Sequence, residues 1–152
     1  MKKTSILIVD DNEGVRETRS SILEEKGYNT DTAKNGAEAI EKSKIKFYNI
    51  VLLDIKLPDI EGTKLLTEIQ ETRPKMIKIM ITGYASLQNT IEALNLGADA
   101  YIMKPLNPED LLKVIAEKSK IQRESEAINK KKMVEWIKTR ALKLEREQQM
   151  KT

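Results

Sequence analysis

Residues 50–54 are Ile50-Val51-Leu52-Leu53-Asp54, four apolar residues followed directly by an acid. A short apolar run rich in branched side chains is typical of a strand that is buried on both faces. The segment after it contains Pro58 and Gly62, which favour a loop. We therefore predict a central strand of a parallel sheet, with the Asp54 carboxylate at its carboxyl end.

The same alternation continues in both directions along the chain. Four further apolar runs predict strands, over residues 6–9, 28–33, 76–81 and 101–103. Stretches with helical spacing and with cap or stop residues predict helices over residues 12–26, 35–44, 63–72 and 86–95 and from residue 107 onward. Five strand–helix units predict an α/β fold: a flavodoxin-like, doubly wound, five-stranded parallel sheet, (βα)5, with an extended C-terminal helix.

The composition excludes several kinds of chemistry. The chain has no cysteine and no histidine, which rules out disulfides, thiolate or imidazole metal sites, Ser/His and Cys/His catalysis and a histidine phosphocarrier. No apolar run approaches the ~20 residues of a membrane span, and the N-terminal run is too short for a signal peptide. We therefore expect a cytoplasmic protein whose chemistry uses carboxylates, hydroxyls, lysines and the main chain.

Charge divides the chain into a body and a tail. Residues 117–152 contain 11 Lys/Arg against 6 Asp/Glu, a net of +5, so the rest of the +3 chain carries −2. We predict a compact domain over residues 1–120 and a basic helical extension over residues 121–152, with no recognisable output domain. From residue 109 onward the chain contains no Gly or Pro, which favours one long helix.

Three interpretations of the extension stay open. It forms a homodimer through residues 121–150, it docks on another protein such as a kinase, or it is a mobile solvated helix. Dimerisation is favoured by heptad-like spacing of five residues, namely Val134, Ile137, Ala141, Leu144 and Gln148. The basic run of residues 130–132 raises nucleic acid or an anionic membrane as partners. A solvated polar face explains it equally well, and without a helix-turn-helix we expect no nucleic acid partner.

Polar residues end four of the five predicted strands. In doubly wound sheets the functional groups gather at the carboxyl ends of the strands, near the change in strand order. The residues at those ends are Asp10, Asp11, Asp54, Thr82 and Lys104. Taken singly, the two N-terminal acids are better explained as helix caps, and the lysine as a surface residue. Asp54 is equally well explained as a turn residue, and Thr82 is explained as an ordinary turn former. Their coincidence at one sheet edge favours a site.

These residue types suit a cation together with a phosphoryl group. Three converging carboxylates repel one another and could share a proton or bind a cation, and an all-oxygen site suits Mg²⁺. Thr82 can donate a hydrogen bond, and Lys104 brings a positive charge to a phosphoryl oxygen. Asp54 is the best nucleophile, because it stands alone at the end of the central strand and is ionised at pH 7 without a base.

Five sequence elements together resemble the response-regulator receiver domain of two-component (phosphorelay) signalling systems. The resemblance covers residues 1 to about 120. The elements are Val9-Asp10-Asp11-Asn12, Leu53-Asp54-Ile55-Lys56-Leu57-Pro58-Asp59-Ile60-Glu61-Gly62, Ile81-Thr82-Gly83-Tyr84-Ala85, Gly97-Ala98-Asp99-Ala100-Tyr101 and Met103-Lys104-Pro105.

The resemblance implies a role for each matching position. Asp54 would accept a phosphoryl group from a sensor histidine kinase. Mg²⁺ (or Mn²⁺) would be held by four groups: Asp10, Asp11, Asp54 and the backbone carbonyl of Ile55. The phosphoryl group would be contacted by Thr82 and Lys104. Tyr101 would be the switch aromatic, which rotates into the space that Thr82 leaves when it turns toward the phosphoryl group. The resemblance also implies a cis peptide bond between Lys104 and Pro105.

The function implied is a binding switch, with self-catalysed stoichiometric phosphotransfer, slow autodephosphorylation and no turnover. Phosphorylation would change a protein-binding or dimerisation surface over about residues 83–121. In the family, positions like those of Lys56 and Tyr84 tune the phosphoryl lifetime, and an equally good interpretation is that both are solvated loop residues. The alternative is a phosphatase or phosphotransferase with an aspartyl-phosphate intermediate, which would want a second acid where Lys56 stands. A flavin carrier is disfavoured because acids follow the first strand.

Overall fold

The computed structural model describes residues 3–69, 75–83 and 87–150. It divides into two compact units, Met1–Ser119 and Lys120–Thr152. The long helix α5, Pro108–Met150, contributes its first turns to the first unit and forms the described part of the second. This continuous helix confirms the extended C-terminal helix predicted from the sequence.

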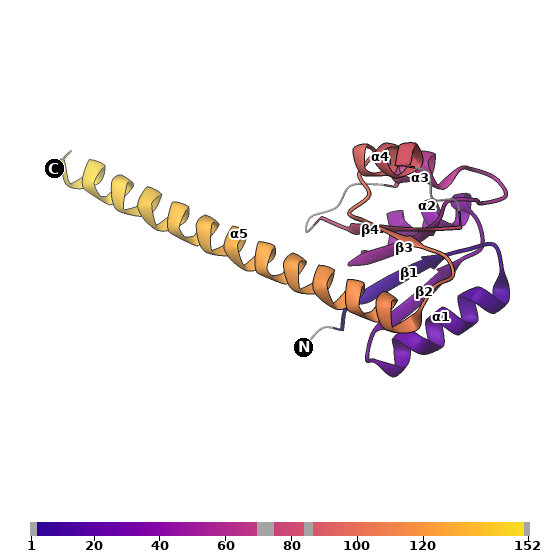
Figure 1. Ribbon diagram of the computed structural model, residues 1–152. Coiled ribbons are helices and arrows are strands. Elements are labelled where there is room, and N and C mark those ends of the chain that lie inside the picture. Colours follow the sequence, from indigo (N-terminus) through magenta and orange to yellow (C-terminus); the bar gives the residue numbers. More distant parts are fainter. Residues whose placement is uncertain (1–2, 70–74, 84–86, 151–152) are drawn as a thin grey trace. The chain divides into compact units, whose positions relative to one another are not determined.

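The first unit is built on a five-stranded parallel sheet in the order β2-β1-β3-β4-β5 (Figure 1). The strands are β1 Ser5–Val9, β2 Asn29–Ala33, β3 Ile50–Asp54, β4 Ile77–Thr82 and β5 Ala100–Met103. The helices between them are α1 Glu13–Glu25, α2 Gly36–Ile45, α3 Gly62–Glu68 and α4 Leu87–Asn95. This order confirms the flavodoxin-like fold and puts β3 at the centre.

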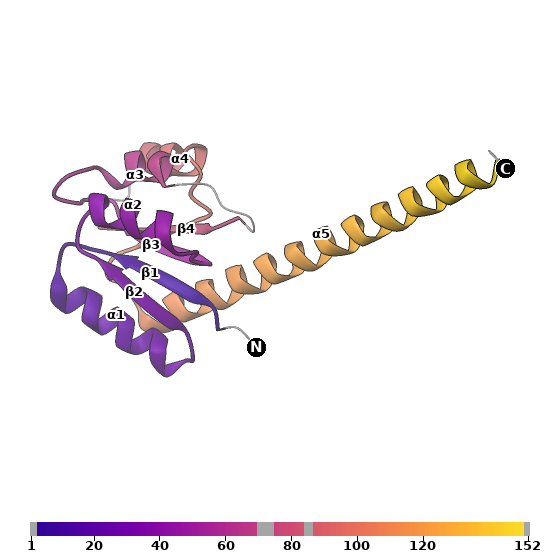
Figure 2. The ribbon, with the colours of Figure 1, turned by 180° about the vertical axis from the view of Figure 1, so that it is seen from behind.

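Alternation along the strands directs apolar side chains into two cores. Leu7, Leu53 and Met80 belong to the core that includes residues of α2, α3 and α4. Ile8, Leu52 and neighbouring strand residues belong to the other core, with residues of α1 and the first turns of α5. The ribbon accordingly has α2, α3 and α4 on one face of the sheet and α1 on the other (Figures 1 and 2). Both faces are covered, as burial of a parallel sheet requires.

Side-chain caps begin the helices that follow β1 and β2. Asn12 Oδ1 accepts a hydrogen bond from Val15 N at 3.0 Å, and Asn35 Oδ1 accepts one from Glu38 N at 2.8 Å. Asp59 adds a long-range cap, because its two carboxylate oxygens accept from Gly36 N and Ala37 N, each at 2.9 Å. The loop after β3 is thereby tied to the first turn of α2.

Helix α3 is shorter than its sequence pattern predicted. It ends at Glu68, and Ile69 has an extended backbone (φ −69°, ψ 126°) with its side chain in the core. The buried Lys78 of β4 donates from Nζ to the Leu66 carbonyl at 3.0 Å, which caps this helix end. The predicted end near Thr72 and Pro74 lies outside the described residues.

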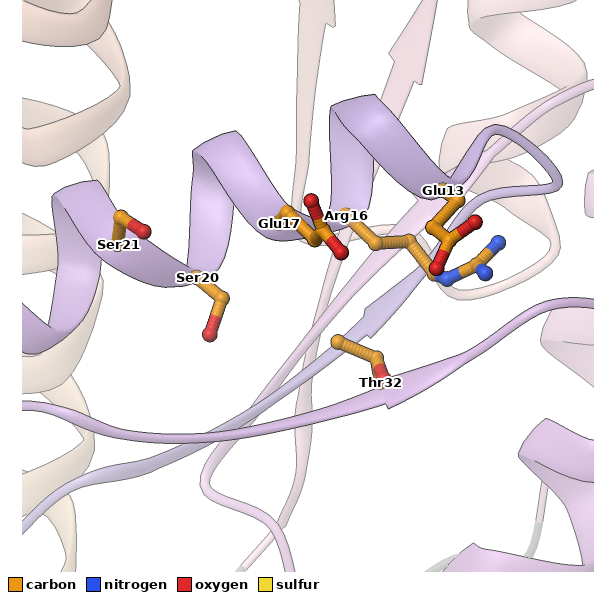
Figure 3. A pocket seen from close by; sticks show the side chains of 6 residues that line it. All are labelled: Glu13, Arg16, Glu17, Ser20, Ser21 and Thr32. Atoms are coloured by element: carbon orange, nitrogen blue, oxygen red, sulfur yellow. The ribbon is translucent and has the colours of Figure 1, made fainter.

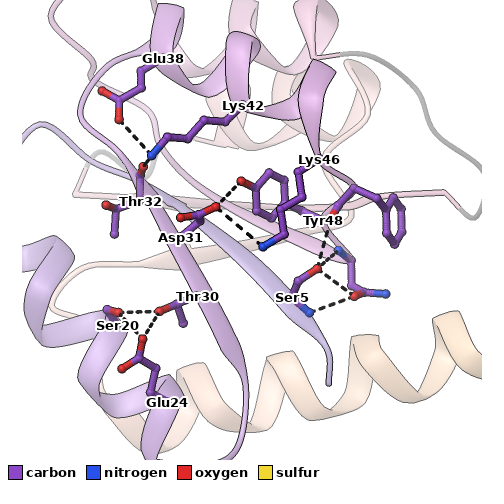
Figure 4. A network of polar contacts seen from close by, with 12 residues as sticks. Ser5, Ser20, Glu24, Thr30, Asp31, Thr32, Glu38, Lys42, Lys46 and Tyr48 are labelled. Atoms are coloured by element: carbon purple, nitrogen blue, oxygen red, sulfur yellow. Dashed lines mark hydrogen bonds and ion pairs between the residues drawn. The ribbon is translucent and has the colours of Figure 1, made fainter. Parts of the chain in front are cut away.

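The edge strand β2 is covered by polar side chains (Figure 4). Tyr48 donates its hydroxyl hydrogen to Asp31 Oδ2 at 2.6 Å, and burial raises the pKa of Tyr48, which keeps it a donor. Lys42 donates to the Thr32 carbonyl, and Ser20 and Glu24 contact the Thr30 hydroxyl. Charged and hydroxyl groups along an edge strand disfavour pairing with a foreign strand.

The second unit is a helical segment with many exposed apolar side chains. Its exposed large apolar side chains are Ile121, Ile128, Met133, Val134, Trp136, Ile137, Leu142, Leu144 and Met150. Within the part of the chain that is described, no helix combines the length and the apolar character needed to span a bilayer.

Candidate functional site at the carboxyl edge of the sheet

The sheet brings the predicted acids together at one edge. Asp10 follows β1 directly, and Asp54 is the last residue of β3, the strand beside it. With the neighbouring Asp11, each offers one carboxylate oxygen, and these oxygens all lie within 4.8 Å of one another. The convergence of three carboxylates, expected from strand order alone, is therefore present.

Asp54 is held by two donors. Its Oδ1 accepts from the Lys56 main-chain N–H at 3.1 Å, and its Oδ2 accepts from Lys104 Nζ at 3.0 Å. Asp54 is only 6 % exposed, so little of the residue is accessible to solvent. Gly62 lies directly behind it: a Cβ there would come within 2.4 Å of the Asp54 carbonyl oxygen. The loop after β3 can pack this closely only with glycine at that position.

Asp10 is the most enclosed of the three acids, at 2 % exposure. Its Oδ1 accepts from Asn12 N at 2.9 Å, and its Oδ2 lies 3.3 Å from Arg19 Nη1. Burial raises the pKa of Asp10, and nearby Asp54 acts in the same direction, against the lowering effects of the Asn12 N–H and the Arg19 charge. A further positive charge nearby would therefore stabilise the ionised form of the Asp10 carboxylate.

Asp11 is exposed, and one of its carboxylate oxygens lies within 4.8 Å of an oxygen of each of the other two acids. The Ile55 carbonyl accepts a hydrogen bond from Gly62 N at 2.8 Å, which occupies one of its two lone pairs. A set of carboxylates with one exposed member fits a hard divalent cation that keeps several waters. The residues present therefore fit Mg²⁺.

The other predicted residues lie on the two strands beyond β3. Thr82 ends β4 and is fully buried, and its carbonyl accepts from Lys104 N at 2.7 Å. Tyr101 pairs in register with Met80 and packs against the core on the α2–α4 face. The Lys104–Pro105 peptide bond is cis, as the sequence resemblance implied. Tyr84 lies outside the described residues.

Arg19 is the site residue that sequence reasoning missed. It is 5 % exposed, and its guanidinium reaches Asp10 from α1. Its spacing indicates only that residue 19 faces inward, because it lies four positions after Val15 and four before Leu23. Arg16 lies nearby but contacts the main chain, donating from Nη1 to the Asp10 carbonyl at 2.8 Å.

Two hollows adjoin α1, and they differ in character. One of about 430 Å³ is bounded by Glu13, Arg16, Glu17, Ser20, Ser21 and Thr32 (Figure 3). It is polar and includes none of the predicted site residues. A second, also of about 430 Å³, is bounded by Asn12, Gly14, Val15, Thr18, Arg19, Ile22, Leu106 and Pro108. The first adjoins the acidic site through Arg16, which donates to the Asp10 carbonyl, and the second adjoins it through Asn12 and Arg19.

Comparison with known proteins gives one consistent family. Residues 6–116 match the model of the response regulator receiver domain. The chain is 34% identical over 110 residues to the transcriptional regulatory protein ResD of Bacillus subtilis, which covers 72% of this chain and 45% of ResD. It is 32% identical over 117 residues to the regulatory protein AtoC of Escherichia coli, covering 77% and 25%. The chain thus spans less than half the length of these curated relatives.

Solved structures give the same match at the level of the fold. A CheY-like receiver domain protein from Methanospirillum hungatei JF-1 is 49% identical, with a TM-score of 0.78 and coverage of 82% of this chain and 99% of that one. A response regulator from Burkholderia pseudomallei, solved with a phosphorylated aspartic acid, a calcium ion and citrate, is 30% identical. Its TM-score is 0.68, with coverage of 84% and 75%.

Proposed function

Because the chain belongs to the response regulator receiver domain family of two-component signalling, we propose that it is a switch controlled by phosphorylation of Asp54. The observation that carries the assignment to Asp54 is its contact with Lys104, whose Nζ lies 3.0 Å from Asp54 Oδ2. A buried carboxylate beside a lysine and two further acids has both a nucleophilic oxygen and the charges that phosphoryl transfer needs.

The proposed partner in this transfer is a phosphohistidine on a sensor kinase. An oxygen of Asp54 attacks phosphorus, so that an O–P bond forms while the P–N bond breaks. The imidazole nitrogen keeps the electron pair and takes a proton from water. Asp54 needs no external base, and Lys104 neutralises charge on the phosphoryl oxygens. The reaction is stoichiometric, with slow autodephosphorylation, so we assign no enzymatic turnover.

The family's acidic pocket binds Mg²⁺, and we assign that role here to Asp10, Asp11 and Asp54. The Ile55 carbonyl is the weakest member of the proposed set, because it already accepts from Gly62 N. When bound, the cation neutralises charge on the phosphoryl oxygens. Asp11, which is exposed, gives the cation its approach from solvent.

The proposed readout links the phosphoryl group to a surface on the side of β4 and β5. Thr82 would turn toward the phosphoryl group, and Tyr101, which packs against the neighbouring core, would move into the space released. This shifts an existing equilibrium of the face over about residues 83–121. We propose residues 1–120 as the receiver and residues 121–152 as the extension that passes the signal to a protein partner or a second copy. A cytoplasmic location is part of the proposal.

Phosphorylation of the purified chain tests the assignment directly. We expect incubation with Mg²⁺ and acetyl phosphate to add one phosphoryl mass to the wild type and none to Asp54→Asn. Glu61→Gln is the matched control, since it removes an exposed acid from the same loop. A wild type that gains no phosphoryl mass, or an Asp54→Asn variant that gains it equally, would overturn the assignment.

A further inference from the structure

A buried arginine stands behind the acidic site on the inward face of α1. Burying a guanidinium is costly unless a partner compensates it. The compensating contact here is the ion pair of Arg19 Nη1 with Asp10 Oδ2, whose side chains are 7 % and 2 % exposed. An apolar side chain would satisfy the helix spacing without that cost. The arginine at this position therefore calls for an explanation beyond packing.

Arg19 changes the charge of the site. The three clustered carboxylates carry −3, and the cations in contact with them, Arg19 and Lys104, reduce this to −1. Both oxygens of Asp10 also accept hydrogen bonds, from Asn12 N and from Arg19 Nη1. About half of the lone pairs of the Asp10 carboxylate are therefore occupied before a divalent cation binds. The fixed positive charge of Arg19 also lies next to this carboxylate and repels a bound cation.

We propose that Arg19 is a positioning residue that sets the affinity of the acidic site for its divalent cation, weakening Mg²⁺ binding while stabilising the metal-free site. It orients the Asp10 carboxylate and supplies one permanent charge that a metal would otherwise provide. The inference rests on the proposed Mg²⁺ site, and it adds to that site a residue of α1 that lies outside the five family-like sequence elements. Its consequence is a receiver whose metal occupancy responds to Mg²⁺ concentration.

The test measures Mg²⁺ affinity by calorimetry, and Tm both in a chelator and at saturating Mg²⁺. Arg19→Gln keeps a donor near Asp10 but removes the charge, and we expect its Mg²⁺ Kd to be about tenfold tighter than that of the wild type. Arg19→Lys restores the charge and should bring the Kd back toward the wild-type value. Lys26→Gln removes an exposed positive charge at the far end of α1 and should change the Kd less than about threefold.

The temperatures separate an electrostatic role from a structural one. We expect Arg19→Gln to lower Tm in chelator and Mg²⁺ to restore most of the loss. An equal loss of Tm with and without Mg²⁺, or an unchanged Kd in Arg19→Gln, would overturn the inference while leaving the metal site standing. If neither the wild type nor the variants bind Mg²⁺, the metal site fails and this inference fails with it.

Discussion

Lys104 Nζ lies 3.0 Å from Asp54 Oδ2, so a lysine after β5 holds the carboxylate at the end of β3 across 50 residues of sequence. The contact exists because parallel strands present their carboxyl ends at one edge. Asp54 is almost enclosed, whereas the Lys104 side chain is 37 % exposed. The ammonium group can therefore shift toward a phosphoryl oxygen at modest cost.

Removing this ammonium group should slow phosphorylation far more than it destabilises the fold. We expect Lys104→Ala to lower the initial rate of phosphoryl uptake from acetyl phosphate by roughly a hundredfold, because a preorganised positive group is lost. The free energy of unfolding should fall by no more than about 1 kcal/mol, since the partly exposed ion pair is screened by solvent. Lys44→Ala, which removes a lysine paired with Glu41 on the surface, should leave the rate unchanged. An unaltered rate in Lys104→Ala would contradict the role given to Lys104.

Gly62 should tolerate no side chain, for reasons of space. An added Cβ would lie 2.4 Å from the Asp54 carbonyl oxygen and 2.7 Å from Ile55 Cα, both backbone atoms. We expect Gly62→Ala to lower the free energy of unfolding in urea by about 1–3 kcal/mol. In Gly14→Ala the nearest atom is Asn12 Oδ1 at 3.3 Å, on a side chain that can move. That variant should stay within about 1 kcal/mol of the wild type, and equal losses in the two variants would refute the steric argument.

Much of the fold could be predicted from the pattern, because each apolar run is short and four of the five end at a polar group. The strand positions and the end of β3 at Asp54 could be predicted from this alternation. The end of α3 could not, because it depends on Ile69 entering the core and on Lys78 reaching Leu66 O from β4. Helical spacing carries no information about such a tertiary contact.

The acidic site shows the same limit on a smaller scale. Asp10 and Asp54 could be predicted from strand ends, since neighbouring parallel strands must bring those ends together. Arg19 lies on the inward stripe of its helix, but arginine side chains are mostly exposed in proteins, so its sequence position did not predict burial. Only the distance of 3.3 Å to Asp10 identifies its partner.

Asp59 predicts a particular dependence of stability on pH. Its carboxylate accepts hydrogen bonds from Gly36 N and Ala37 N, and these lower the pKa of Asp59 below its ordinary value of 3.8. A group whose pKa is lower when folded stabilises the fold above its unfolded pKa and loses that contribution as pH falls through the folded value. The Tm of the wild type should therefore exceed that of Asp59→Asn at pH 7, with the difference shrinking below about pH 4.

The control for this profile is Glu61→Gln, a substitution in the same loop. Thermal melts at several pH values compare both variants with the wild type, and the decline is predicted for Asp59→Asn, whose carboxylate is the one that caps α2. A constant gap between the wild type and Asp59→Asn from pH 7 down to the acid limit would show that the carboxylate charge contributes nothing to capping α2.

The exposed apolar residues of the extension predict a homodimer. Val134, Ile137 and Leu144 recur at heptad-like spacing and are exposed on the described helix. A second copy would bury this stripe, whereas a glutamate within the stripe would place like charges against each other. We therefore expect the wild type to sediment as a dimer at high concentration and Leu144→Glu as a monomer.

Leu142 offers the matched control, because it is an equally exposed leucine outside the heptad-like positions. Leu142→Glu adds the same charge two residues away and should remain dimeric in the same sedimentation experiment. Dissociation by both variants would point to a general effect of charge on the helix. A monomeric wild type at high concentration would exclude a second copy as the partner of this stripe. The stripe would then either dock on another protein or stay solvated.

Dimers in all three proteins would instead indicate that the dimer forms through the surface over about residues 83–121. In that case acetyl phosphate should change the sedimentation of the wild type but not of Asp54→Asn.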